Sequence, residues 1–135
     1  VFLVREKMLS TGVDMFLDIH GDEAIPHNFL AGCEGCPSYD EKQAVIANKF
    51  KDFLLAITPE FQTEAGYPVD KPNQANLSLA ATWVGEQFTC LSYTIEMPFK
   101  DNFKLPDLEM GWSDERSKIF GKDVLTAIHH VVNII

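Results

Sequence analysis

Hydrophobic positions along the chain follow two kinds of spacing, and these predict four helices and two strands. Apolar residues that recur every three or four positions indicate helices. Alternation around β-branched and aromatic residues indicates buried strands. In chain order the expected elements are a helix over 1–10, a strand over 13–20, helices over 38–57 and 77–86, a strand over 88–97, and a helix from about 113.

Local signals at the ends of these segments support the assignment. Gly12 is suited to a left-handed helix cap, and Gly21 is expected to end the first strand. Ser38 and Glu41 have the spacing of a capping box, and Thr58-Pro59 would stop the helix that they open. The helix face expected in the core carries Val45, Ile46, Phe50, Phe53, Leu54 and Ile57, and that of the last helix carries Phe120, Val124, Ile128, Val131 and Ile135.

Strands placed among helices predict a sheet covered on both faces, and therefore part of an α/β domain. Two or three strands make a small sheet. The first residues, from Val1, read as the middle of a helix with no initiator methionine. We therefore expect residues 1–135 to be one portion of a larger domain, with no internal boundary and with the rest of the sheet upstream.

The composition narrows the choice of partners. The 135 residues carry 20 acidic and 11 basic side chains, for a formal charge of −9. This balance argues against nucleic acid and anionic membranes as partners, since both need a basic surface. No apolar run approaches a membrane span. Three cysteines do not make a disulfide framework, which favours a reducing compartment and a cytoplasmic location.

Two predicted strand ends carry side chains suited to chemistry. His20 ends the first strand, where α/β proteins bind ligands, and neutral imidazole is a common zinc ligand. In the second strand Ser92, Thr94 and Glu96 share one face. A carboxylate at the end of an apolar strand is costly unless it is paired or used. A loop histidine and a solvated glutamate are the plainer interpretations of the same residues.

Other candidate residues are weaker. Cys33 and Cys36 form a lone Cys-x-x-Cys pair in the middle of a loop, with Cys90 inside a strand. Incidental loop thiols explain them better than a redox or zinc motif does. Of His129 and His130 on the last helix, one is expected to face solvent and the other to pack at the edge of the core.

The runs Asp18-Ile19-His20-Gly21-Asp22-Glu23-Ala24-Ile25-Pro26-His27-Asn28-Phe29-Leu30-Ala31-Gly32 and Thr94-Ile95-Glu96-Met97-Pro98-Phe99-Lys100-Asp101-Asn102 resemble the zinc carboxypeptidases related to carboxypeptidase A. The bacterial members of the cytosolic, deglutamylase-like branch are the most similar group. The resemblance implies a three-layer α/β/α domain with a mixed sheet, of which this chain is the C-terminal half. It implies cleavage of C-terminal residues from peptides or proteins.

The same resemblance assigns roles to three residues. His20 matches the third zinc ligand, Glu96 the general base and acid, and Thr94 a position that lines the pocket for the terminal side chain. The first two ligands come from an upstream His-x-x-Glu motif. His20 and Glu23 also have the His-x-x-Glu spacing. If they were the first ligand pair, His129 or His130 would be the third ligand. The catalytic glutamate would then have to follow, but the sequence ends at Ile135.

Parts of the family's site have no counterpart here. The arginines, Arg5 and Arg116, are far from the motifs in sequence, and the arginine that binds the substrate carboxylate is upstream in the family. Tyr67 is the nearest but a poorly aligned candidate for the pocket tyrosine. We therefore expect this chain to be inactive alone. A zinc amidohydrolase of the aspartoacylase and desuccinylase type, a non-catalytic fragment that oligomerises through an exposed sheet edge, and a thiol-based role stay as alternatives.

Overall fold

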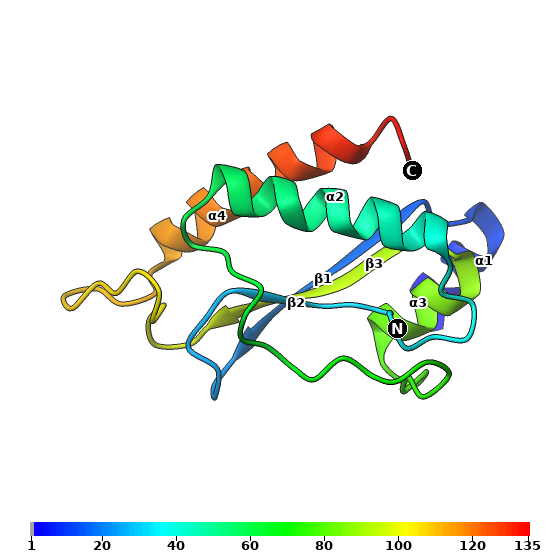
Figure 1. Ribbon diagram of the computed structural model, residues 1–135, viewed down its shortest axis with the longest axis horizontal. Coiled ribbons are helices and arrows are strands. Elements are labelled where there is room, and N and C mark those ends of the chain that lie inside the picture. Colours follow the sequence, from blue (N-terminus) through cyan, green and yellow to red (C-terminus); the bar gives the residue numbers. More distant parts are fainter. Residues whose placement is uncertain (1) are drawn as a thin grey trace.

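The computed structural model describes residues 2–135 and contains a mixed three-stranded sheet with helices on both faces (Figure 1). The structure confirms the predicted order of helices and strands and adds one strand. In chain order the elements are α1 (Phe2–Thr11), β1 (Met15–Asp22), β2 (Phe29–Ala31), α2 (Glu41–Ile57), α3 (Ala80–Phe88), β3 (Leu91–Pro98) and α4 (Asp114–Val131). Val1, which the sequence places in the first helix, lies outside the described residues.

The sheet has the order β1-β3-β2, so the last strand in sequence lies in the middle. β1 and β3 are parallel along their full length, from Met15 opposite Leu91 to Asp22 opposite Pro98. β2 is antiparallel to β3. The parallel pairing brings the carboxyl ends of β1 and β3 to the same edge of the sheet, which is where the predicted chemistry-bearing residues are.

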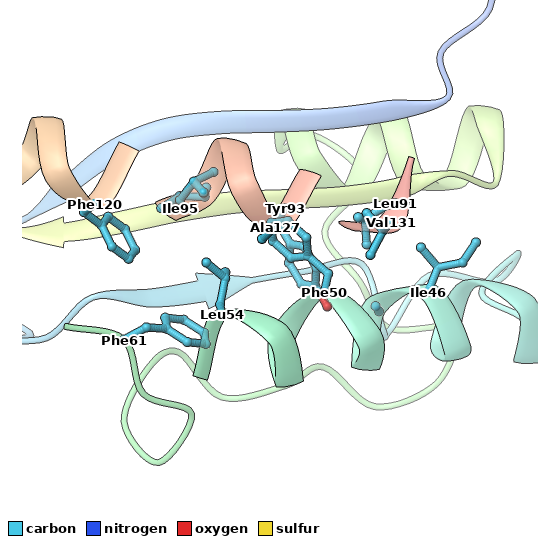
Figure 2. Close-up of a cluster of buried hydrophobic side chains, with 12 residues drawn as sticks. Ile46, Phe50, Leu54, Phe61, Leu91, Tyr93, Ile95, Phe120, Ala127 and Val131 are labelled. Carbon is cyan, nitrogen blue, oxygen red and sulfur yellow. The ribbon is translucent and has the colours of Figure 1, made fainter. Parts of the chain in front are cut away.

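The core lies between the sheet and the pair of helices α2 and α4 (Figure 2). Leu91, Tyr93 and Ile95 alternate along β3 and point toward these helices. Their burial, with that of the helix residues, removes large apolar side chains from water and is the main stabilising term. The buried helix residues are Ile46, Ala47, Phe50 and Leu54 of α2 and Phe120, Val124, Ala127 and Val131 of α4.

Helix α3 covers part of the opposite face. The Ser92 hydroxyl donates a hydrogen bond to the Ala81 carbonyl at 2.6 Å. Gly85 lies so close to Cys33 that a Cβ there would come within 2.5 Å of the Cys33 sulfur. The same Cβ would lie 3.4 Å from Cβ of Ser92 on β3, so the glycine lets the helix approach the sheet closely. The face that carries Ser92, Thr94 and Glu96 is therefore the face turned away from α2 and α4, because side chains alternate along a strand.

Some predicted boundaries are wrong. β1 does not end at Gly21 but continues through it to Asp22. The capping box of α2 is formed by Asp40 and Gln43, not by Ser38 and Glu41: Asp40 Oδ1 accepts from the Gln43 N–H at 2.8 Å, and Gln43 Oε1 accepts from the Asp40 N–H at 3.2 Å. Ser38 instead contacts Glu86, whose side chain and carbonyl accept its N–H and its hydroxyl.

The sequence pattern predicts a loop where the structure has strand β2. It has only three residues and lies inside a segment rich in glycine, proline and histidine, so no alternation can build up. Gly12 does adopt a positive φ of 77° after α1 and donates to the Met8 carbonyl, as predicted. Both histidines of α4 are exposed by area, but the ring of His130 stacks on Phe53, which packs against the core, so one of the two lies at its edge as expected. Among residues 2–135 no helix has the length and apolar character needed to cross a membrane.

Candidate active site

The register of the two parallel strands places His20 and Glu96 side by side. They are direct partners across β1 and β3, and they project from the face opposite α2 and α4. Their relative position is therefore set by the backbone hydrogen bonds of the sheet and not by a flexible loop. The structure thus brings together the two residues that the sequence singles out.

His20 is open to solvent on one side, and its side chain is 51% exposed. Its Nε2 atom lies 3.1 Å from Oδ2 of Asp18, which is two residues earlier on the same face of β1. A carboxylate beside one ring nitrogen orients the imidazole and leaves the other nitrogen, Nδ1, for a ligand. The sequence analysis does not assign a role to Asp18. The Asp-x-His spacing at the end of a strand is the signal that could have identified it.

Glu96 is 5% exposed, although it carries a carboxylate. Burial raises its pKa above the usual range, and the nearby Asp22 and Asp18 carboxylates add to this, while His20 and Tyr67 oppose it. Its Oε2 atom has no hydrogen-bond partner among the described residues. A buried and unpaired carboxylate oxygen is unfavourable in a purely structural position and is typical of a group that acts on a ligand.

A tyrosine and a second carboxylate complete the immediate surroundings. The Tyr67 hydroxyl donates to Oδ2 of Asp22 at 2.5 Å and lies 3.4 Å from Oε1 of Glu96. The hydrogen bond from Tyr67, with the N–H of Ile25, lowers the pKa of Asp22. The pKa of Tyr67 is raised, mainly by the same bond. The sequence named Tyr67 only as a poorly aligned candidate for the pocket tyrosine, and the path of the 58–79 loop brings it beside Glu96.

Thr94 is half-buried, and in the sheet it lies between Asp18 of β1 and Ala31 of β2. A pocket of about 120 Å³ begins one strand away, with Ala31 and Tyr67 in its wall. Two carboxylates, Glu34 and Asp70, line this pocket. No lysine or arginine is among the described residues that line it, although Lys51 pairs with Glu34 from outside at 3.5 Å.

Arg116 is not available to bind a substrate. Its guanidinium makes two hydrogen bonds to the Glu60 carboxylate, at 2.9 and 2.8 Å, and one to Asp101 at 2.8 Å. The side chain is 13% exposed and lies over the ring of Trp112. Arg5 lies over Trp83 on the far side of the chain, beside α3. Neither arginine makes a hydrogen bond or an ion pair with His20 or Glu96.

The three cysteines are free and buried. Burial raises the pKa of Cys33 to about 12 and those of Cys36 and Cys90 to about 11. Reactive thiols need the opposite shift, because the thiolate is the nucleophile and the metal ligand. The structure thus favours the interpretation of Cys33 and Cys36 as structural loop thiols.

A metal centre built from this chain alone would be incomplete. In the described part of the chain no group of three or more histidine, cysteine, aspartate or glutamate side chains is placed to hold a metal ion. The residues that are present could supply part of such a centre. A solvent-exposed imidazole oriented by a carboxylate stands beside a buried carboxylate with a free oxygen, which is one ligand and one base.

Comparison with solved structures places this arrangement in a class, the metallocarboxypeptidase fold. The chain matches a metallocarboxypeptidase from Pseudomonas aeruginosa with a TM-score of 0.96 and 48% identity, over 99% of this chain and 36% of that one. A metallocarboxypeptidase from Burkholderia cenocepacia matches with a TM-score of 0.94 and 45% identity, over 100% of this chain and 36% of that one. The predicted fold, part of a three-layer carboxypeptidase-like domain with a mixed sheet, is confirmed.

An uncharacterized protein of Zymomonas mobilis is 47% identical to the chain over 130 residues, which are 96% of this chain and 34% of that protein. No protein-family model matches the chain. The chain thus spans about a third of the length of the proteins that it resembles. The matched solved structures are those of metal-dependent peptidases, which supports a hydrolase and implies a metal.

Proposed function

We propose that this chain is the C-terminal portion of a zinc metallocarboxypeptidase, which removes the C-terminal residue of a peptide or protein. Residues 1–135 would form one piece without an internal boundary, in a cytoplasmic enzyme of the bacterial, deglutamylase-like branch. The observation that carries the proposal is the pairing of His20 with Glu96 across two parallel strands, with one Glu96 oxygen buried and unpaired.

In this proposal His20 is the third zinc ligand, held by Asp18, and the other two ligands come from upstream. When bound, zinc would supply Lewis acidity for the scissile carbonyl and the attacking water. Glu96 accepts a proton from the attacking water. It then delivers that proton to the nitrogen of the leaving amine. The raised pKa of Glu96 suits it to hold the proton between these steps.

The pocket beside Tyr67 bears on the choice of terminal residue. Its carboxylates, Glu34 and Asp70, disfavour an acidic side chain and suit a neutral or basic one. The Pseudomonas aeruginosa structure is a complex with (2-guanidinoethylmercapto)succinic acid, a molecule with a guanidino group. Thr94, one strand from the pocket, would contact the terminal residue from the side of the sheet.

The test uses the full-length protein encoded by the gene that contains this chain. Its substrates are benzoylglycyl peptides ending in arginine, phenylalanine or glutamate. We expect one bound zinc per chain by elemental analysis, and slower hydrolysis of the peptide ending in glutamate. Glu96→Gln should keep the zinc and lower kcat by about 100-fold or more, because the proton acceptor is lost.

Two further variants complete the design. His20→Ala should lose both zinc and activity, whereas His129→Ala, on the outer surface of α4, should lose neither. The 135-residue chain alone should be inactive. Full activity in Glu96→Gln, or zinc retained in His20→Ala, would contradict the assignment. Hydrolysis of N-acyl amino acids in place of peptides would favour the amidohydrolase alternative.

A further inference from the structure

The hydroxyl of Tyr93 is buried without a hydrogen-bond partner. Tyr93 is 2% exposed, and its ring stacks on that of Phe50 of α2, with centroids 6.1 Å apart (Figure 2). Its oxygen has no partner among residues 2–135. A phenol buried in this way loses the hydrogen bonds that it makes in water, and phenylalanine would fill the same space without that loss. The hydroxyl therefore points to a ligand that the protein side chains do not supply.

A small cavity of about 10 Å³ has Tyr93 in its wall. Burial raises the pKa of Tyr93, and the charges of Glu34, Tyr39 and Cys33 raise it further. These three residues all line the cavity, so the Tyr93 hydroxyl lies on its side of the ring. The buried Gln43 side chain is part of the same wall. The cavity has room for a single water molecule, and its polar groups provide the about two to four partners that a buried water needs.

Glu34 is the charged residue of this wall, and its two oxygens have different surroundings. Oε1 lies 3.5 Å from Nζ of Lys51, which does not line the cavity. A Cβ added at Gly32 would overlap both Oε2 of Glu34 and Cε1 of Tyr93, so the carboxylate and the tyrosine ring press against the same glycine. No hydrogen bond joins them. Oε2 is thus near the Tyr93 side chain but is not its partner.

We propose that one internal water molecule in this cavity bridges Tyr93 to Glu34. The water accepts the Tyr93 O–H and donates one proton to Oε2 of Glu34. Its other proton goes to Oε1 of Gln43, which accepts the Asp40 N–H at 3.2 Å and has a second lone pair. About three hydrogen bonds are typical of a buried water. Glu34 also lines the pocket beside Tyr67, so the bridge fixes one of that pocket's two carboxylates from within. The bridge belongs to the fold and does not depend on the proposed function.

The test is the crystal structure of the full-length protein, at a resolution that shows ordered water, for the parent and for Tyr93→Phe. We expect one water in the parent within hydrogen-bond distance of both the Tyr93 oxygen and a Glu34 carboxylate oxygen. In Tyr93→Phe the ring should keep its place on Phe50, and the water should be lost. Asp70→Asn is the matched control and should keep the water, because Asp70 lines the neighbouring pocket and not this cavity. A direct hydrogen bond between Tyr93 and Glu34, a cavity without a water, or a water that stays fully ordered in Tyr93→Phe would overturn the proposal.

Melting temperatures of the full-length protein give a second readout. Tyr93→Phe and Glu34→Ala each remove one end of the same bridge, so the double variant should lose less than the sum of the two single losses. Tyr93→Phe and Asp70→Asn share no partner, and their losses should add. Additive losses in the first pair would contradict the bridge. If Tyr93→Phe does not fold, the crystal structures of the parent and of Glu34→Ala, which should also lose the water, decide between the outcomes.

Discussion

Arg116 shows how much a single residue can organise without touching the site. Its guanidinium binds Glu60, Asp101 and the carbonyls of Gly111 and Leu105. The Glu60 carboxylate and its own carbonyl also accept from Asn102. The loop that follows α2 and the loop between β3 and α4 are thereby tied together.

Replacing Arg116 should therefore change stability and not substrate binding. In the full-length protein, Arg116→Met leaves the Glu60 charge buried and unpaired, which costs about 3–5 kcal/mol when a buried pair is broken. We expect a clearly lower melting temperature and an unchanged KM in the fraction that stays folded. Arg116→Lys keeps the charge but loses the planar guanidinium with its paired donors, so the loss of stability should be smaller than for Arg116→Met. A raised KM at normal stability would instead make Arg116 the residue that binds the substrate carboxylate.

At the level of single residues, the sequence predicted the pair of His20 and Glu96 but not what surrounds it. Both residues end segments with a clear hydrophobic pattern, so their place at a sheet edge follows from topology. Asp22 was hidden because Gly21 suggested that the strand had ended. Tyr67 could not be assigned, since it reaches the site through a long loop whose path depends on tertiary contacts such as those of Gln62 and Gly66.

At the level of elements, the start of α2 differs from its prediction. The capping box lies at Asp40 and Gln43, two residues later than the predicted Ser38 and Glu41. Ser38 and Asp40 are both good helix caps and are both followed three residues later by Glu or Gln. Ser38 is taken by Glu86 of α3, which leaves Asp40 to begin the helix. A contact between distant segments therefore decided between two equivalent local signals.

The cap gives a direct prediction for stability. Asp40→Ala should destabilise the full-length protein by about 1 kcal/mol, because the first-turn N–H of Gln43 loses its acceptor. Asp40→Asn should cost only a few tenths of that, since asparagine caps nearly as well. Thermal unfolding of both variants measures the difference. Equal melting temperatures for Asp40→Ala and the parent would mean that the box does not stabilise the helix.

Helices α2 and α4 were predictable because each buries one face, and β3 because nearly all of its residues are buried, whereas no residue of α1 is buried. Of the apolar residues expected on α2, Ile46, Phe50 and Leu54 are buried and Val45 is exposed, and Ala47 is buried although it was not expected. Strand β2 could not be predicted, because the three residues that pair with Thr94, Ile95 and Glu96 are too few to show an alternating pattern. A strand that is defined by its neighbour has no pattern of its own.

At the scale of the whole molecule, β1 forms one edge of the sheet within the described residues. Ile19, on this strand, is 57% exposed. An apolar pocket of about 340 Å³ runs beside it, between β1 and α4, and Leu17, Leu125 and Ile128 are part of its wall. An exposed strand edge next to an apolar surface is a site for pairing with another strand. In the proposed enzyme, upstream strands would cover it.

The isolated 135-residue chain should therefore associate with itself. We expect sedimentation to show species larger than a monomer at micromolar concentrations. Ile19→Lys should reduce this association by placing a charge on the edge, whereas Leu108→Lys, on a loop away from it, should not. A monomer at all concentrations would show that the edge is not exposed in solution. Association that persists in the full-length protein would favour the oligomerising alternative.

The central position of β3 has a consequence for how the gene can change. Because its side chains alternate, a deletion or insertion of one residue near Cys90 would shift the strand by one step and exchange its two faces. Tyr93 and Ile95 would then leave the core, and the Glu96 carboxylate would turn toward Phe50 and Phe120. Length variation in this lineage should therefore be absent between α3 and β3 and concentrated in the outer loops, since one lost codon here would remove both the fold and the chemistry.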